Sequence, residues 1–121
     1  MNNHPVLFDV PEEMWVRRRC AVCGCALSVT YEYTYVVQRQ DWVKIGATNL
    51  PRRRLNELAR PAWRKHVLHP KGMDWNSPLK VLAVVGGDVE HELHKEFSDS
   101  HDTGEWFYND ESIHEWLKEV T

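Results

Sequence analysis

The feature that most constrains the fold is a strictly alternating run, Tyr31-Glu-Tyr33-Thr-Tyr35-Val-Val37. An aromatic or branched side chain stands at every second position, which is the pattern of a β-strand with one buried face. A second short strand is predicted over residues 41–47, with residues 39 and 40 as a tight turn between the two strands. In that register, Tyr35 lies directly opposite Lys44 on one face of a hairpin.

The rest of the chain predicts helices and one further strand around this hairpin. Thr48 or Asn49 is expected to cap a helix with Pro51 in its first turn, and Asp88 is expected to cap another. The expected segments are a helix over residues 52–60, an irregular insert over 61–78, an apolar strand over 79–85, a helix over 89–97, an extended segment over 106–108 and a helix over 110–120. This order indicates an α+β fold in which a small mixed sheet is covered by helices.

Length and composition predict one domain preceded by a short extension. A chain of 121 residues with 42% hydrophobic residues and six tryptophans is large enough for one hydrophobic core and too small for two. Residues 31–121 carry the regular pattern, and residues 1–30, with their cysteine cluster, are interpreted as an N-terminal extension. No apolar run approaches the roughly 20 residues of a membrane helix, so we expect a cytoplasmic protein without a membrane partner.

The arginines are clustered although the net charge is −3. That net charge argues against a protein that coats nucleic acid indiscriminately. Two arginine groups, Arg17-Arg18-Arg19 and Arg52-Arg53-Arg54, nevertheless form local basic patches that can bind the phosphate backbone of DNA. The alternative for each group is an ordinary solvated surface.

Histidines and carboxylates crowd into residues 89–107. His91-Glu-Leu-His94 is close to the signature of zinc proteases, but that signature needs histidines four apart, and these are three apart. A zinc-dependent hydrolase is therefore disfavoured. His91 and His94 are interpreted either as surface histidines of an amphipathic helix or as a pair that shares a metal.

Five short motifs in a fixed order resemble the GIY-YIG nuclease superfamily. They are Tyr35-Val-Val37, Lys44-Ile-Gly46, Arg54-Leu55, Glu90-x-x-Leu-His94 and Gly104-Glu-Trp-Phe107. The chain is most similar to the phage and fungal branch, in which the second motif reads K-I-G-x-T and the tail reads G-E-W-F. The resemblance covers about residue 31 to the C-terminus and implies a three-stranded mixed sheet flanked by helices.

The resemblance also implies roles for individual residues in a metal-dependent endonuclease acting on DNA. Tyr35 would deprotonate or orient the attacking water if its pKa is lowered, and Lys44 is the cation suited to lowering it. Arg54 would bind the phosphate, and Glu90 would bind one Mg²⁺ or Mn²⁺. Lys44 stands where most of the superfamily has tyrosine.

The superfamily's late asparagine has no clear match in this chain. Asn109 is the nearest candidate, and His94 or His101 is a candidate for part of its role. Gly104-Glu-Trp-Phe107 is interpreted mainly as core closure, with Glu105 either a surface carboxylate or a hydrogen-bond anchor. The rival hypothesis is a non-catalytic nucleic-acid-binding or regulatory module on the same fold. Specificity is expected to be modest or to come from a homodimer or a protein partner.

The cysteines raise a separate question. Cys20-x-x-Cys23-Gly resembles one knuckle of a zinc ribbon, in which glycine lets backbone amides turn towards the thiolates. His66-x-x-His69 has suitable spacing to complete a structural zinc site, and Cys25 offers a third sulfur. The alternative is a set of reduced cysteines packed in the N-terminal segment.

Overall fold

A five-stranded antiparallel sheet forms the centre of the computed structural model, which describes residues 20–25, 31–60 and 69–121. The elements are β1 (Tyr33–Arg39), β2 (Trp42–Thr48), α3 (Pro51–Ala59), β3 (Lys80–Gly86), α4 (Glu90–Glu96), a 3₁₀ turn (Ser98–Ser100), β4 (His101–Thr103), β5 (Trp106–Tyr108) and α5 (Glu111–Val120). The α+β class is confirmed. Within these ranges, no helix has the length and apolar composition that crossing a membrane requires.

The sheet differs from the expected three-stranded mixed sheet in the number of strands and in their direction. It has five strands in the order β3-β1-β2-β5-β4, and every neighbouring pair among these strands is antiparallel. The two extra strands arise because β5 adds to the free edge of β2, with Lys44 beside Trp106, and then pairs with β4. This addition brings the Gly104-Glu-Trp-Phe107 motif next to the first hairpin.

The β1–β2 hairpin is shifted by two residues from the predicted register. Tyr35 pairs with Gly46 instead of Lys44, and Lys44 pairs with Val37. The turn consists of residues 40 and 41, and Gln40 accommodates it with a left-handed φ of 54°. Because side chains alternate with a period of two, an even shift leaves each of them on its predicted face. Tyr35 and Lys44 are therefore diagonal neighbours on one face of the sheet.

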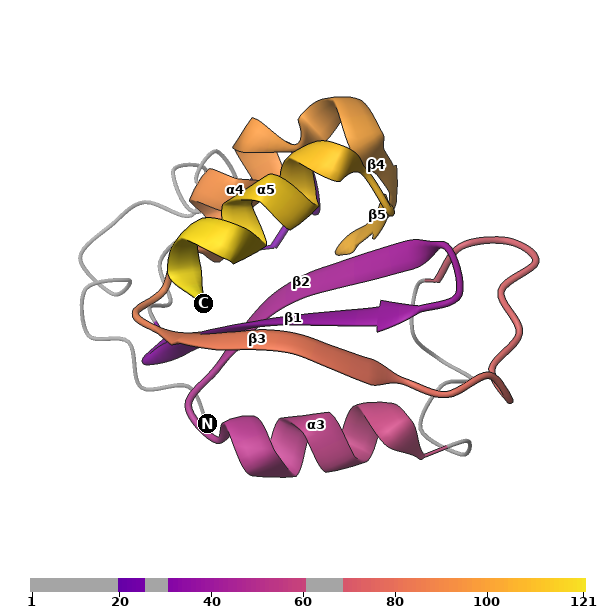
Figure 1. Cartoon of the computed structure of the whole chain (residues 1–121). Helices are drawn as coiled ribbons and strands as arrows, with labels where there is room; N and C mark the ends of the chain where they lie inside the picture. The colour runs from indigo at the N-terminus through magenta and orange to yellow at the C-terminus, as the bar shows by residue number, and fades with distance from the viewer. Residues whose placement is uncertain (1–19, 26–30, 61–68) are drawn as a thin grey trace, which may run out of the picture.

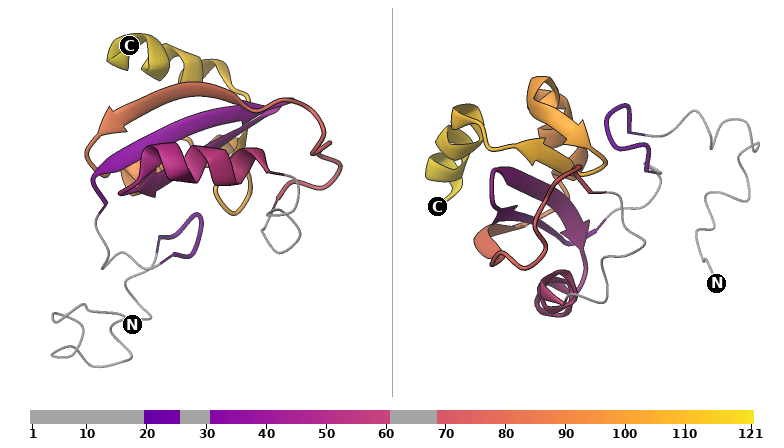
Figure 2. Two further views of the ribbon diagram at one scale, coloured as in Figure 1. Left: turned by 90° about the horizontal axis from the view of Figure 1, so that it is seen from below. Right: turned by 90° about the vertical axis from the view of Figure 1, so that its right-hand side faces the viewer.

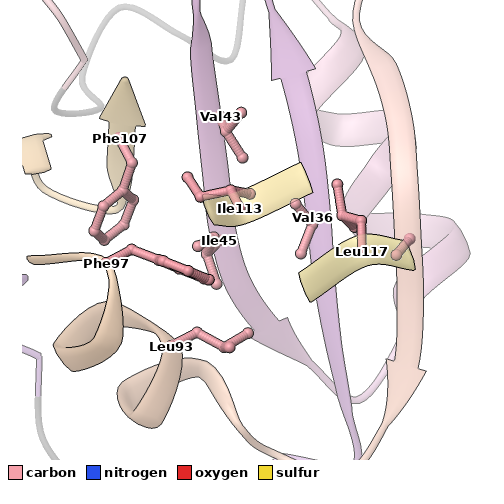
Figure 3. Close-up of a cluster of buried hydrophobic side chains, with 9 residues drawn as sticks. Val36, Val43, Ile45, Leu93, Phe97, Phe107, Ile113 and Leu117 are labelled. Atoms are coloured by element: carbon pink, nitrogen blue, oxygen red, sulfur yellow. The ribbon is translucent and has the colours of Figure 1, made fainter. Parts of the chain in front are cut away.

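Helices cover both faces of the sheet, as Figures 1 and 2 show: α3 lies on one side, and α4 and α5 lie on the other. The α4/α5 side holds the larger hydrophobic core, shown in Figure 3, which is built around Val36, Val43, Ile45, Phe97, Phe107 and Ile113. A smaller cluster on the α3 side contains Tyr35, Val37 and Leu58. Tyr35 thus belongs to the face that α3 covers.

Two of the predicted helix caps are wrong. The residue before α3 is Leu50, which has no side-chain cap, while Pro51 is in the first turn as expected. Thr48 accepts a hydrogen bond from the Leu50 amide at 3.1 Å, and Asn49 accepts one from the Glu32 amide at 2.9 Å. Both side chains shape the approach to the helix instead of capping it.

Asp88 likewise does not occupy the cap position of α4, which falls on Val89. Its carboxylate accepts a hydrogen bond from the Tyr31 amide at 2.8 Å and a longer one from the Glu90 amide at 3.4 Å. Local capping therefore stabilises the first turn of α4, which carries Glu90, only weakly.

Candidate active site and cysteine–histidine cluster

Three of the predicted catalytic residues line one pocket of about 460 Å³. Tyr35 comes from β1, Arg54 from the first turn of α3, and Glu90 from the first position of α4. The other lining residues are Cys25, Tyr31, Ala47, Thr48, His91 and Glu105. The pocket lies at the end of the sheet where both helices begin, so the fold brings together residues that are 55 positions apart in the chain, from 35 to 90.

Gly46 explains how the Tyr35 ring is placed. A Cβ atom at Gly46 would overlap the hydroxyl oxygen and ring carbons of Tyr35, so the ring lies directly on the glycine backbone. Arg54 Nε donates a hydrogen bond to the Tyr35 hydroxyl at 3.3 Å. The motif glycine is thus required by close approach of the tyrosine, and Tyr35 and Arg54 act as one unit.

The pKa of Tyr35 is raised, contrary to the expectation that it would be lowered. Burial is the largest cause, because it disfavours the charged phenolate. The cations of Lys44 and Arg54 act in the opposite direction, as anticipated for Lys44, but they do not outweigh burial. At neutral pH, Tyr35 is a neutral phenol in this structure.

Lys44 is a buried cation held by a partner that the sequence did not identify. Its side chain is 4% exposed, and its Nζ lies 2.9 Å from Glu105 Oε1 and 5.6 Å from the centre of the Trp106 ring. Burial by itself lowers the pKa of Lys44, but the negative charge of Glu105 and its hydrogen bond with Lys44 raise that pKa above its usual value. Lys44 is not among the residues that line the pocket. It influences the pocket through its charge, which acts to lower the pKa values of Tyr35 and Glu105.

Glu90 and Glu105 place two carboxylates in the same pocket. Burial, together with the neighbouring Glu105, raises the pKa of Glu90 to about 10. Burial acts against ionisation of Glu105 as well, but Lys44 holds the pKa of Glu105 down at about 2. The two carboxyl groups therefore differ sharply in ionisation, which is common where a site is arranged for chemistry.

The Glu90 oxygens fit a role as ligands of a hard cation. Glu90 is 3% exposed, and its Oε2 atom has no hydrogen-bond partner among the described residues. Because its pKa is raised to about 10, the Glu90 carboxyl group is protonated at neutral pH, and a divalent cation that displaces this proton would satisfy the unpartnered oxygen. Glu105 was missed as a site residue because its position depends on β5 pairing with β2. One signal could have indicated Glu105: a lysine on the buried face of a strand requires an anionic partner.

His94 lies behind Glu90 and does not line the pocket. Its Nε2 lies 2.8 Å from the carbonyl oxygen of Ile45, and because a carbonyl only accepts, this nitrogen carries the proton. Burial lowers the pKa of His94, so the ring is neutral and its Nδ1 is bare. That Nδ1 faces Cys20 Sγ at 3.7 Å.

The candidates for the late asparagine also lie outside the pocket. Asn109 contacts His114, and the His101 ring donates to the Gly104 carbonyl at 2.9 Å. Neither Asn109 nor His101 is among the residues that line the pocket beside Glu90.

A cluster of four potential metal ligands forms where residues 20–25 meet α4. The ligand atoms of Cys20, Cys23, His91 and His94 all lie within 4.8 Å of one another, so this cluster could hold a metal ion such as zinc. The predicted completion by His69 is not found, because the His69 ring packs against Trp75 with centroids 4.9 Å apart. His66 lies outside the described residues.

The arginines of α3 extend the pocket along the molecular surface. Arg52 and Arg53 are exposed and line a neighbouring hollow of about 640 Å³ together with Arg60. A smaller hollow that contains both Arg53 and Arg54 joins this region to the pocket. Arg17, Arg18 and Arg19 lie outside the described residues.

Comparison with known proteins gives one family match. A family model described as the T5orf172 domain matches residues 31–121, which include every strand and helix of the described structure. No curated protein matches the chain, and no solved structure does.

Proposed function

The chain belongs to the T5orf172 domain family, which is phage-associated and related to nucleases, and from this premise we propose that it is a metal-dependent DNA endonuclease. The observation that carries the proposal is the convergence of Tyr35, Arg54 and Glu90 on one pocket from three separate elements. These residues supply what phosphodiester hydrolysis requires: Tyr35 a group that orients the attacking water, Arg54 a cation that binds the phosphate, and Glu90 a ligand for the metal ion.

Arg54 binds the scissile phosphate in this proposal. Its guanidinium carries several donors in a planar fork, and donation of Nε to Tyr35, with Nη1 at 3.6 Å from Glu57 Oε1, fixes its orientation at the pocket wall. The negative charge that builds on the phosphate oxygens in the transition state is stabilised by this positioned cation.

Glu90 would hold a single Mg²⁺ or Mn²⁺, with Glu105 as the second acidic residue beside it. The bound cation would supply Lewis-acid stabilisation of the leaving oxygen. Glu90 presents a buried oxygen without a hydrogen-bond partner among the described residues, and Lys44 keeps Glu105 ionised beside the protonated Glu90, whose proton a bound cation would displace. With one dedicated carboxylate, the pocket would hold the cation tightly only when the substrate phosphate adds its own oxygens.

Tyr35 orients the attacking water. Its raised pKa keeps the phenol protonated at neutral pH, so its hydroxyl acts as a hydrogen-bonding group at a fixed position rather than as a phenolate base. Packing of the ring on the Gly46 backbone and the hydrogen bond from Arg54 fix that position. Lys44 contributes through its charge, and His94 contributes by fixing α4 behind Glu90.

The DNA backbone follows the arginine side of α3. Arg52 and Arg53 are exposed beside the pocket, and the hollows that they line are continuous with it through Arg54. Such contacts position a phosphate backbone without reading its sequence. Sequence specificity therefore comes from elsewhere, either from a second copy of the chain or from a protein partner.

The test is nicking of supercoiled plasmid with Mg²⁺ or Mn²⁺. Glu90→Gln and Arg54→Ala should each lower the nicking rate by roughly 100-fold, because each removes a group that acts in the transition state. Glu92→Gln, on the exposed side of the same helix, and Lys118→Ala, exposed on α5, are controls with rates within a few-fold of wild type. Binding of DNA without nicking would favour the non-catalytic module instead.

A further inference from the structure

The cluster of Cys20, Cys23, His91 and His94 has no part in the proposed cleavage chemistry. We propose that it binds one structural zinc ion and so fastens residues 20–25, called the knuckle below, to the start of α4. The four proposed ligands do not include Glu90, but Glu90 adjoins them, because one of its oxygens lies within 4.8 Å of Cys23 Sγ and one lies 3.8 Å from His91 Nε2. The proposal stands whether or not the protein cleaves DNA.

The spacing of the ligand atoms matches tetrahedral zinc. Zinc bonds of about 2.3 Å to sulfur and about 2.0 Å to nitrogen at tetrahedral angles place sulfur and nitrogen about 3.5 Å apart. Cys20 Sγ and His94 Nδ1 lie 3.7 Å apart, and all four ligand atoms fall within 4.8 Å of one another. Only small side-chain movements would bring the four onto one ion.

His94 is already in the tautomer that a metal ligand needs. Its Nε2–H group donates to the Ile45 carbonyl at 2.8 Å, which leaves the bare Nδ1 directed at Cys20. Imidazoles that bind zinc usually donate their second nitrogen to a carbonyl or carboxylate in this way. The hydrogen bond therefore prepares His94 as a ligand and links the site to β2.

The knuckle is folded to direct its thiols inward. The Cys20 amide donates to the Cys25 carbonyl at 2.9 Å, and the Gly24 amide donates to the Cys20 carbonyl at 2.9 Å. Gly24 has a φ of +80°, which glycine adopts readily and other residues rarely do. This closed turn matches the knuckle predicted from Cys20-x-x-Cys23-Gly.

The donor set selects zinc and a structural role. Thiolates and imidazoles prefer zinc over Mg²⁺, and four protein ligands leave no open position for a substrate or a reactive water. Cys20 and His94 are buried, as suits a closed site. Cys25 lies 3.0 Å from Cys23 Sγ and 3.6 Å from His91 Nε2, so it is the neighbouring thiol that could compete with Cys23. Cys23 is assigned because it lies within reach of both Cys20 and His94.

The zinc site would hold the element that carries Glu90. Helix α4 has only seven residues, its N-cap residue Val89 makes no side-chain capping hydrogen bond, and its first amide, that of Glu90, has a long hydrogen bond of 3.4 Å to Asp88. Zinc bound to His91 and His94 would fix that turn immediately after Glu90. Cys25 lines the active pocket, so the knuckle also forms part of the pocket wall.

The first test measures metal on the unmutated, full-length chain by elemental analysis and by cobalt replacement. About one zinc per chain is expected, and Co²⁺ in its place should show thiolate-to-cobalt absorption together with the intense visible bands of tetrahedral cobalt. These measurements need no variant, so they do not depend on whether a variant folds. No zinc in protein produced with zinc present, or no thiolate band with Co²⁺, would overturn the proposal.

The second test assigns the ligands. Cys23→Ser and His91→Ala should lower bound zinc by at least about tenfold under a competing chelator, because each removes one of four ligands. Cys25→Ser and His69→Ala are matched controls that should keep about one zinc per chain. Zinc retained in both ligand variants would overturn the proposal, and zinc lost in Cys25→Ser but kept in Cys23→Ser would overturn the assignment of Cys23.

Discussion

Gly46 is the residue whose identity is most tightly dictated by its surroundings. The phenol of Tyr35 lies where a side chain at position 46 would begin. The Tyr35 ring can take this position because Gly46 is its direct cross-strand partner. The short motif Lys44-Ile-Gly46 therefore combines a buried cation with the space that the tyrosine occupies.

Gly46→Ala should displace the Tyr35 ring, lower stability by about 1–3 kcal/mol and abolish most nicking activity. Gly86→Ala is the matched control on β3, because a Cβ there meets no atom within 4 Å. Thermal unfolding and plasmid nicking measure the two effects. Equal behaviour of the two alanine variants would contradict the close packing of Tyr35 on Gly46.

Lys44 and Glu105 should behave as a coupled pair. Lys44→Met removes the only cation placed 2.9 Å from Glu105 among the described residues, and it leaves that carboxylate beside Glu90. Breaking one side of such a pair should cost about 3 kcal/mol, whereas Lys44→Met combined with Glu105→Gln should recover a large part of it. A double-mutant cycle by urea unfolding measures the coupling, and additive effects would contradict the pairing.

At the scale of elements, helix α5 is the best-capped helix of the described structure. Asp110 precedes it, accepts from the Ser112 amide at 3.3 Å and also accepts from the Ser100 hydroxyl. These hydrogen bonds favour the ionised carboxylate and lower the pKa of Asp110 below its ordinary 3.8. Helix α5 supplies Ile113 and Leu117 to the main core, so its start affects the whole sheet face.

Asp110→Ala should lower the melting temperature at pH 7, and the difference from wild type should shrink in acid. A carboxylate with a depressed folded pKa contributes stability that is present above its unfolded value of 3.8 and is lost as the pH falls below it. Melting curves of both proteins from about pH 2 to about pH 7 measure how the difference in melting temperature changes with pH. A difference that stays constant across this range would show that the cap acts without its charge.

The sequence predicted most elements because local periodicity determines them. Alternation identified β1, and the apolar spacing identified α4 and α5 to within about two residues of their observed ends. The predicted hairpin register differs from the observed one by two residues because Gln40 adopts a left-handed conformation, and residues 40 and 41 carry no turn signal such as Asn-Gly. The even shift nevertheless kept Tyr35 and Lys44 on one face.

At the scale of the whole molecule, long-range pairings could not be predicted. Glu105 reaches Lys44 only because β5 joins β2, and His94 reaches Cys20 across 74 positions of the chain. His69 was chosen for the zinc site by spacing alone, although its ring packs against Trp75. The one-dimensional motif order predicted the Tyr35–Arg54–Glu90 set, but the partners that tune that set depend on the folded structure.

The arginine side of α3 should give the protein a sequence-independent, salt-sensitive affinity for DNA. Arg52→Ala and Arg53→Ala should each weaken binding to unrelated duplexes by a similar factor and reduce the slope of log affinity against log salt by about one. Lys118→Ala, exposed on α5 across the sheet from α3, is the control with an unchanged slope. Fluorescence anisotropy at several salt concentrations measures the slopes, and a preserved slope in both arginine variants would place the DNA elsewhere.

The most direct test of the central claim is to locate a catalytic cation by anomalous scattering in crystals of the protein grown with Mn²⁺ and a short DNA duplex. The account predicts a manganese peak in the pocket, bonded to a Glu90 carboxylate oxygen at about 2.1 Å and facing a phosphate held by Arg54. A DNA-bound structure with no peak at Glu90, or with manganese only at other carboxylates, would contradict the claim that this pocket is a nuclease active site.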